Sequence, residues 1–245
     1  MTVYLWDTHS HLYQIPHWEE LLPKLEEERI KVIVVGEERK SNEKVKEICK
    51  KFPKLLYPAF GLHPYLLPQL DVKRELEWLE ENLSTATAVG EVGLDFKGEE
   101  AKDSQIEVFL TLLDLAKKFD LPVIIHSRKA ARECVEVVRD SGWRKVVFHW
   151  FTGSSSLVED IVELDGYFSV GPQASLSHSY RKVVEKAPLE RIILETDSPV
   201  SFKGIPTSPL QVKDAVKVVS LLKGEPMEKV VEITSANVYK IFGLK

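Results

Sequence analysis

The chain has 245 residues, of which 44% are hydrophobic and 29% charged, and its formal net charge at pH 7 is −5. This length and apolar content suffice for one large core, and a single α/β barrel commonly fills a chain of this size. The negative balance excludes a surface that is basic on all sides. A polyanionic substrate must therefore be held by local cations or bound metal ions.

Cysteine usage and hydropathy bear on the location of the protein. Cys49 and Cys134 are the only cysteines, and unpaired thiols favour a reducing compartment. The N-terminus carries no basic-plus-apolar signal pattern, and no apolar stretch approaches membrane-spanning length. We therefore expect a cytoplasmic protein that makes no contact with a membrane.

About eight apolar runs follow one another along the chain, separated by segments with helical spacing of apolar residues. The runs are continuous rather than alternating, which is typical of parallel strands that are covered on both faces. We expect Ser41 or Asn42 to cap the second helix. The expected strands cover residues 3–6, 30–36, 55–61, 86–95, 122–126, 145–149, 167–171 and 191–197, and the expected helices 16–28, 41–52, 71–83, 103–119, 129–139, 154–164, 179–187 and from about 209 onward.

This alternation of strands and helices predicts the fold class. A closed (β/α)8 TIM barrel fits the strand count and the length better than an open doubly wound sheet, and no Gly-x-Gly-x-x-Gly follows any expected strand. The chain has no linker and no low-complexity segment. We therefore predict one domain that spans residues 1–245.

The first expected strand runs into Asp7, Thr8, His9, Ser10 and His11. Side chains at positions i and i+2 of a strand point the same way, so His9 and His11 share one face, with Asp7 two residues behind. Two imidazoles at a strand end can form half of a metal site. The motif alone also fits two histidines that are hydrogen-bonded in a core or lie on the surface.

Further potential ligands end other strands. In a barrel the carboxyl ends of the strands converge on one mouth. Taken alone, each histidine at a strand end could instead be hydrogen-bonded within the structure, and each carboxylate could instead cap the following helix. Together, four imidazoles and two carboxylates exceed the needs of one four-coordinate ion and suit a centre in which a carboxylate bridges two ions. The expected ligands are His9, His11, Glu91, His126, His149 and Asp197, with His63 beside them.

The order His-x-His, carboxylate, His, His, Asp resembles the amidohydrolase superfamily. Several local motifs are more specific and look like those of the TatD family of metal-dependent deoxyribonucleases. They occupy residues 7–12 (DTHSHL), 61–64 (GLHP), 90–95 (GEVGLD), 121–128 (LPVIIHSR) and 194–199 (LETDSP), together with Gln105 and Phe109, His149 and 151–153 (FTG), and 237–244.

The resemblance implies a division of the ligands between two divalent ions. His9, His11, Glu91 and Asp197 would surround one ion, and Glu91, His126 and His149 the other, while His63 would contact the substrate. The implied reaction is hydrolysis of DNA phosphodiesters, preferentially in single strands, by trimming of the 3′ end or by nicking. Nitrogen-rich ligation favours Zn²⁺ or Mn²⁺ over Mg²⁺, although the family's activity is commonly associated with Mg²⁺.

The chain departs from the family pattern at three places near the expected rim. Tyr13 and Lys129 stand where members of the family usually carry Asp, and Lys203-Gly204 and Thr207 occupy a region that often shows Arg-Gly and Asn. None of these departures removes an expected ligand, so they bear on substrate preference.

The expected ligands also suggest roles in a mechanism. Asp197 can accept a proton from water, Glu91 bridges the ions, and His63 can protonate the leaving oxygen or steady the phosphate. Glu195 lies two residues before Asp197, so it should point into the barrel and orient a ligand histidine or meet a cation.

Arg128 and Lys129 are the closest candidates for phosphate contacts, ahead of Arg181 and Lys203. Of the remaining histidines, we expect His17 on the surface and His178 in a loop.

Two rival interpretations remain open at this stage. The first is an amidohydrolase-type enzyme that acts on an acyl or amide substrate, such as an aminoacyl-tRNA ester. Many such enzymes bridge their metals with a carboxylated lysine on the fourth strand, whereas Glu91 stands there in this chain. The second is a non-enzymatic metal-binding or scaffold role, which an intact ligand set argues against.

Overall fold

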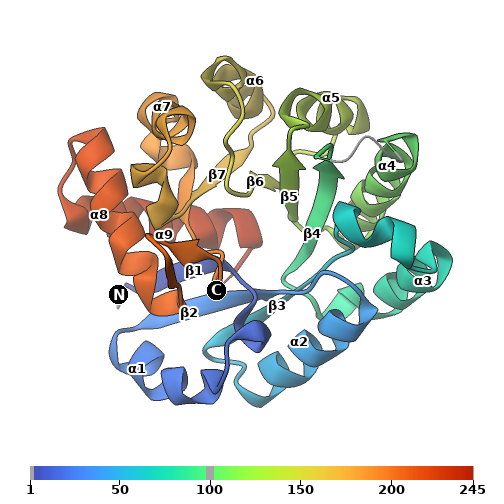
Figure 1. Ribbon diagram of the computed structural model, residues 1–245, viewed down its shortest axis with the longest axis horizontal. Helices are drawn as coiled ribbons and strands as arrows, with labels where there is room; N and C mark the ends of the chain where they lie inside the picture. Colours follow the sequence, from blue (N-terminus) through green and yellow to red (C-terminus); the bar gives the residue numbers. More distant parts are fainter. Residues whose placement is uncertain (1–2, 98–101, 245) are drawn as a thin grey trace.

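The computed structural model describes residues 3–97 and 102–244, and within them eight parallel strands form a sheet in the order β1 to β8 (Figure 1). Helices surround this ring, which confirms the predicted (β/α)8 barrel. The strands are β1 (Leu5–Ser10), β2 (Ile30–Val35), β3 (Leu56–Phe60), β4 (Ala88–Asp95), β5 (Val123–Arg128), β6 (Val146–Phe148), β7 (Tyr167–Val170) and β8 (Ile192–Leu194).

The outer layer contains α1 (Leu22–Glu27), α2 (Arg39–Lys51), α3 (Val72–Asn82), α4 (Lys102–Phe119), α5 (Ala131–Ser141), α6 (Val158–Glu163), α7 (His178–Lys186) and α8 (Val212–Lys223). A last helix, α9 (Met227–Phe242), lies at the amino ends of β1 and β8, where Ser235 Oγ donates to the carbonyl of Tyr4 at 2.7 Å. A small hairpin, β9 (Ser201–Phe202) and β10 (Ile205–Pro206), follows β8. It was not expected from the sequence.

The continuous apolar runs have a simple origin, because both faces of each strand are buried. Along β2, Val32 and Val34 belong to the core between strands and helices, whereas Ile33 and Val35 belong to a second core. This second core joins side chains from all around the barrel to the underside formed by α9. Its other members are Trp6, Ala59, Ala88, Ile124, Val147, Tyr167, Ile193, Val238, Ile241 and Phe242.

The barrel closes between β1 and β8 through individual hydrogen bonds rather than a regular ladder. The Asp197 N–H donates to the His9 carbonyl at 2.9 Å, and the His11 N–H donates to the Ser198 carbonyl at 2.8 Å. The buried carboxyl of Asp7 accepts both the backbone N–H and the hydroxyl of Thr196, at 2.9 and 2.6 Å. We call these contacts between residues 7–11 and 194–198 the seam.

Two sequence expectations about helix starts are wrong. Helix α2 begins at Arg39, so Ser41 is its third residue and neither Ser41 nor Asn42 is the N-cap. The Ser41 hydroxyl instead accepts the N–H of Glu38, the N-cap residue, at 3.1 Å. The expected helix over 16–28 is a 3-10 turn (Trp18–Leu21) followed by α1. Pro23 explains this break, because proline fits only the first turn of a helix.

Smaller expectations have mixed outcomes. His17 is exposed as predicted, whereas His178 is the first residue of α7 rather than a loop residue. Cys49 and Cys134 are both buried and unbridged. In the part of the chain that the structure describes, no helix combines the length and the apolarity needed to cross a membrane. The cytoplasmic location stays a prediction.

We predict that Asn237→Ala destabilises the fold, because the buried Asn237 amide donates to the carbonyls of Leu189 and Ile192 at 3.0 and 2.8 Å. Loss of these two hydrogen bonds to backbone carbonyls should lower the free energy of unfolding by about 1 to 3 kcal/mol. Chemical denaturation measures the change. Thr111→Ala removes an exposed bond to the Glu107 carbonyl and is the control. Equal effects of the two substitutions would contradict the role of Asn237.

Candidate metal centre

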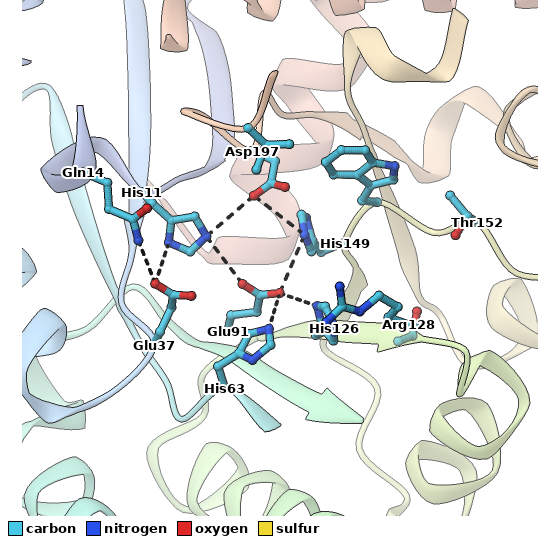
Figure 2. A pocket seen from close by; sticks show the side chains of 13 residues that line it. His11, Gln14, Glu37, His63, Glu91, His126, Arg128, His149, Thr152 and Asp197 are labelled. Atoms are coloured by element: carbon cyan, nitrogen blue, oxygen red, sulfur yellow. Dashed lines mark hydrogen bonds and ion pairs between the residues drawn. The ribbon is translucent and has the colours of Figure 1, made fainter. Parts of the chain in front are cut away.

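A cavity of about 470 Å³ opens at the carboxyl ends of the strands (Figure 2). The cavity gathers the strand-end residues that the sequence singled out, together with several that it did not. It is lined by His11, Gln14, Glu37, His63, Glu91, His126, Ser127, Arg128, His149, Trp150, Thr152, Asp197 and Val200.

Four buried side chains converge on one point at the bottom of this cavity. His9 Nε2 lies 3.3 Å from His11 Nε2, 3.4 Å from Glu91 Oε2 and 3.6 Å from Asp197 Oδ1. His11 Nε2 lies 3.6 Å from each of the same two oxygens. Tetrahedral ligands at the usual Zn–N distance are about 3.4 Å apart. The spacing of this first donor group therefore fits one divalent ion.

The second oxygen of Glu91 faces a different set of imidazoles. Glu91 Oε1 lies 2.6 Å from His126 Nδ1, 3.5 Å from His63 Nε2 and 3.7 Å from His149 Nε2. Figure 2 shows Glu91 between these rings on one side and His11 on the other. We call Glu91, His126 and His149 the second donor group. A carboxylate placed in this way can bridge two cations.

The outer nitrogens of two candidate ligands are already occupied. His11 Nδ1 lies 3.0 Å from the Val35 carbonyl, so it must carry the hydrogen, and Nε2 keeps a lone pair toward the first donor group. His149 Nδ1 lies 2.7 Å from Glu195 Oε2, which likewise frees Nε2. Such partners fix the ring orientation that a metal requires.

The prediction that Glu195 points into the barrel and contacts a candidate ligand is confirmed. The carboxylate is buried, and besides His149 it accepts the Ser169 hydroxyl and the Trp150 N–H, the latter at 3.0 Å. Trp150 has φ of 38° and Asp197 has φ of 54°, a region that residues other than glycine adopt rarely. The bonds from the Trp150 N–H to Glu195 and from the Asp197 N–H to His9 stabilise these conformations.

His63 differs from the other histidines in its hydrogen-bonding state. The Tyr65 N–H donates to His63 Nδ1 at 3.1 Å, so the hydrogen of the neutral ring lies on Nε2. Nε2 is the atom that faces Glu91. This tautomer presents a proton donor to the cavity rather than a lone pair, which supports the expected substrate role.

Burial and the neighbouring charges shift the pKa values of the cavity residues in opposite directions. Burial alone would raise the pKa of Glu91, but the charges of His63 and His9 and hydrogen bonds from His11 and His126 hold it well below its usual value. For Asp197 burial prevails and raises the pKa to about 7. Burial would lower the pKa of His149, but the charge of Glu195 raises it to about 10. Protons on the imidazoles thus balance the buried carboxylates, and a metal ion that binds here takes the place of such protons.

Two glycines allow Glu91 and His126 to approach their neighbours. A Cβ on Gly61 would lie 2.3 Å from the Glu91 nitrogen, so the end of β3 can pass the Gly90–Glu91 peptide only without a side chain. Gly93 has φ of 132°, and a Cβ there would lie 2.2 Å from the His126 carbonyl oxygen. Neither position tolerates another residue without a backbone shift.

Sequence reasoning missed two carboxylates. Asp95 Oδ2 lies 3.1 Å from His126 Nε2 and accepts Arg128 Nε at 2.8 Å, so it links the second donor group to the rim. Asp95 is four residues after Glu91 and thus on the same face of β4, so the alternation of side chains along this strand could have identified it. Glu37 follows β2, and no residue at the end of this strand was predicted to take part in the site.

The predicted phosphate-binding residues lie in different places. Arg128 lines the cavity and points past His126 in Figure 2. Lys129 is exposed with φ of 56° and is not among the lining residues. Both assignments stay predictions.

Comparisons with known proteins agree over nearly the whole chain. Residues 6–243 match the family described as TatD related DNase. The chain is 31% identical to the uncharacterized metal-dependent hydrolase YabD of Bacillus subtilis, over 97% of this chain and 98% of that protein. It is 30% identical to the deoxyribonuclease TATDN3 of Homo sapiens, over 96% and 93%. The crystal structure of the TatD homolog YjjV of Escherichia coli matches with a TM-score of 0.90 at 30% identity, covering 98% of both chains.

We predict that Glu195→Gln weakens metal binding while the protein stays folded. The amide removes the charge that orients His149, and loss of such a partner lowers metal affinity by about 10- to 100-fold. Competition with a chelator measures the affinity. Glu75→Gln is the matched control, because Glu75 is also buried and accepts a backbone N–H, from Arg39, but does not line the cavity. Unchanged affinity in Glu195→Gln would contradict the positioning role.

Proposed function

The chain belongs to the TatD related DNase family and is a metal-dependent hydrolase of ester bonds, and we propose that it removes nucleotides from the 3′ end of single-stranded DNA with two divalent ions. One observation carries the proposal. The two oxygens of the buried Glu91 carboxylate face two separate donor groups, with His9 and His11 on one side and His126 and His149 on the other.

These donor groups suit cations of the first transition series. His9, His11, Glu91 and Asp197 would hold one ion, and Glu91, His126 and His149 the other. Their nitrogen content favours Zn²⁺ or Mn²⁺, while Mg²⁺ prefers oxygen ligands. Two ions bound there would polarise the phosphodiester and lower the pKa of a water molecule toward 7.

The side chains around the donor groups provide the proton transfers. Asp197 uses Oδ1 toward the histidines, so Oδ2 is left to accept a proton as a general base. His63 presents the hydrogen on Nε2 beside Glu91 Oε1. That hydrogen is available to the leaving 3′-oxygen of the shortened strand.

Burial of the donor groups supports a single-stranded substrate. His9, His11, Glu91 and Asp197 are all buried at the barrel end, where one flexible strand reaches them more easily than a duplex. Attraction of DNA to this acidic chain must come from the metal ions and a small number of rim cations. Arg128 is the best placed, because it lines the cavity. We propose Lys129 as a second, outer contact.

We predict different consequences for Glu91→Ala and His63→Ala. Glu91→Ala should lose most of the bound metal, because it removes an atom from both donor groups. His63→Ala should retain its metal while kcat falls about 100-fold, the usual cost of losing one hydrogen-bond donor to the oxygen that gains charge in the transition state. Elemental analysis and kinetics of the two variants decide. Equal metal loss would make His63 a ligand and the assignment wrong.

The reaction itself can be tested with a 5′-labelled single-stranded oligonucleotide and Mg²⁺, Mn²⁺ or Zn²⁺ supplied in turn. We expect stepwise shortening from the 3′ end, and Asp197→Asn should slow it by about 100-fold or more while DNA binding persists. Arylester and N-acyl amino acid substrates are screened in parallel. Turnover of these substrates without cleavage of DNA by any metal would replace the nuclease with an amidohydrolase-type enzyme.

A further inference from the structure

The carboxylate of Glu37 forms one end of the cavity and has no role in the proposed chemistry. One of its oxygens, Oε2, accepts the Tyr13 hydroxyl at 2.8 Å and the Gln14 amide at 2.9 Å. The same oxygen lies 3.7 Å from His11 Nδ1. These contacts hold the side chain in place. In the described part of the chain Oε1 has no hydrogen-bond partner, and Figure 2 shows it directed toward Glu91 across the cavity.

Glu37 lies close behind the first donor group. His11 contacts both, with Nε2 facing the donors and Nδ1 facing Glu37, and one ligand atom each of His11, Glu37 and Glu91 lies within 4.8 Å of the other two. A group attached to a phosphodiester at the donor groups could therefore reach Oε1. A fixed carboxylate oxygen accepts a hydrogen bond from a hydroxyl and repels a phosphate.

The opposite end of the cavity has different chemistry. Arg128 and the hydroxyls of Ser127 and Thr152 line it. His63 lies between the two ends, because its backbone N–H donates to the Glu37 carbonyl at 2.8 Å and its ring lies next to His126, with ring centroids 4.4 Å apart. Figure 2 shows Glu37 and Arg128 at opposite sides of Glu91. The Arg128 cation attracts the phosphates of a bound strand, so the strand would extend from the donor groups toward Arg128. Its terminal nucleoside would then lie toward Glu37.

We propose that Glu37 forms, with Gln14 beside it, a subsite for the free 3′-hydroxyl of the terminal nucleotide and excludes a 3′-phosphate. This inference rests on the proposed function, because it names the end group that the same cavity accepts. The charge of Glu37 prevents a strand from continuing past the donor groups. The subsite thereby restricts cleavage to the chain end.

Three 5′-labelled single strands of one sequence test the subsite, ending in a 3′-hydroxyl, a 3′-deoxy group or a 3′-phosphate. We expect release of the terminal nucleotide from the hydroxyl end to be at least about tenfold faster, in kcat/KM, than from the phosphate end, with the deoxy end between them. In Glu37→Gln the ratio of hydroxyl to phosphate rates should fall to near one. The ratio is insensitive to partial metal loss, because both substrates use the same enzyme preparation.

Glu43→Gln is the matched control, since it removes the charge of an exposed carboxylate that pairs with Arg39 and does not line the cavity, so the ratio should stay high. A 5′-phosphate, far from Glu37, should change no rate. A ratio near one in the unmodified enzyme, or the same ratio in Glu37→Gln, overturns the inference. Cleavage of none of the strands with any metal overturns the proposed function, and this inference falls with it.

Discussion

The carboxylate of Glu91 must stay charged although it is buried, and the arrangement of the barrel mouth follows from this constraint. An unpaired buried carboxylate would be costly. Imidazoles from β1, β5 and the ends of β3 and β6 surround it instead, and they hold its pKa well below the usual value. Further carboxylates back several of these rings, with Glu195 behind His149 and Asp95 behind His126. The mouth therefore consists of layers of alternating charge, with imidazoles around Glu91 and further carboxylates behind the imidazoles.

The sequence predicted the parts of this arrangement that have a strong local signal. Continuous apolar runs identify strands that are buried on both faces, and His9, Glu91, His126 and Asp197 stand out because charged or ionisable groups rarely end such runs. Asp95 and Glu37 were missed because their importance lies in partners that are distant in sequence, namely Arg128 and Tyr13. The start of α2 was also misplaced, because Ser41 serves a capping contact from inside the helix. Pairings between loops depend on three-dimensional register, which composition and periodicity do not contain.

None of the three departures from the family pattern adds a residue to the lining of the cavity. Tyr13 stands where members of the family usually carry Asp, and its hydroxyl donates a hydrogen bond to the Glu37 carboxylate. Lys129 replaces another Asp but lies on the exposed side of its turn. Trp150 presents a large ring at the mouth, on a backbone that the Glu195 contact stabilises.

The seam between β1 and β8 has a consequence for how the enzyme is made. His9 and His11 leave the ribosome before Asp197, and the backbone bonds that join them form only when β1 and β8 meet. A nascent chain can therefore carry most of its histidines without being able to complete the first donor group. The first donor group, and with it any chemistry that needs a metal ion there, is therefore completed only when the barrel closes.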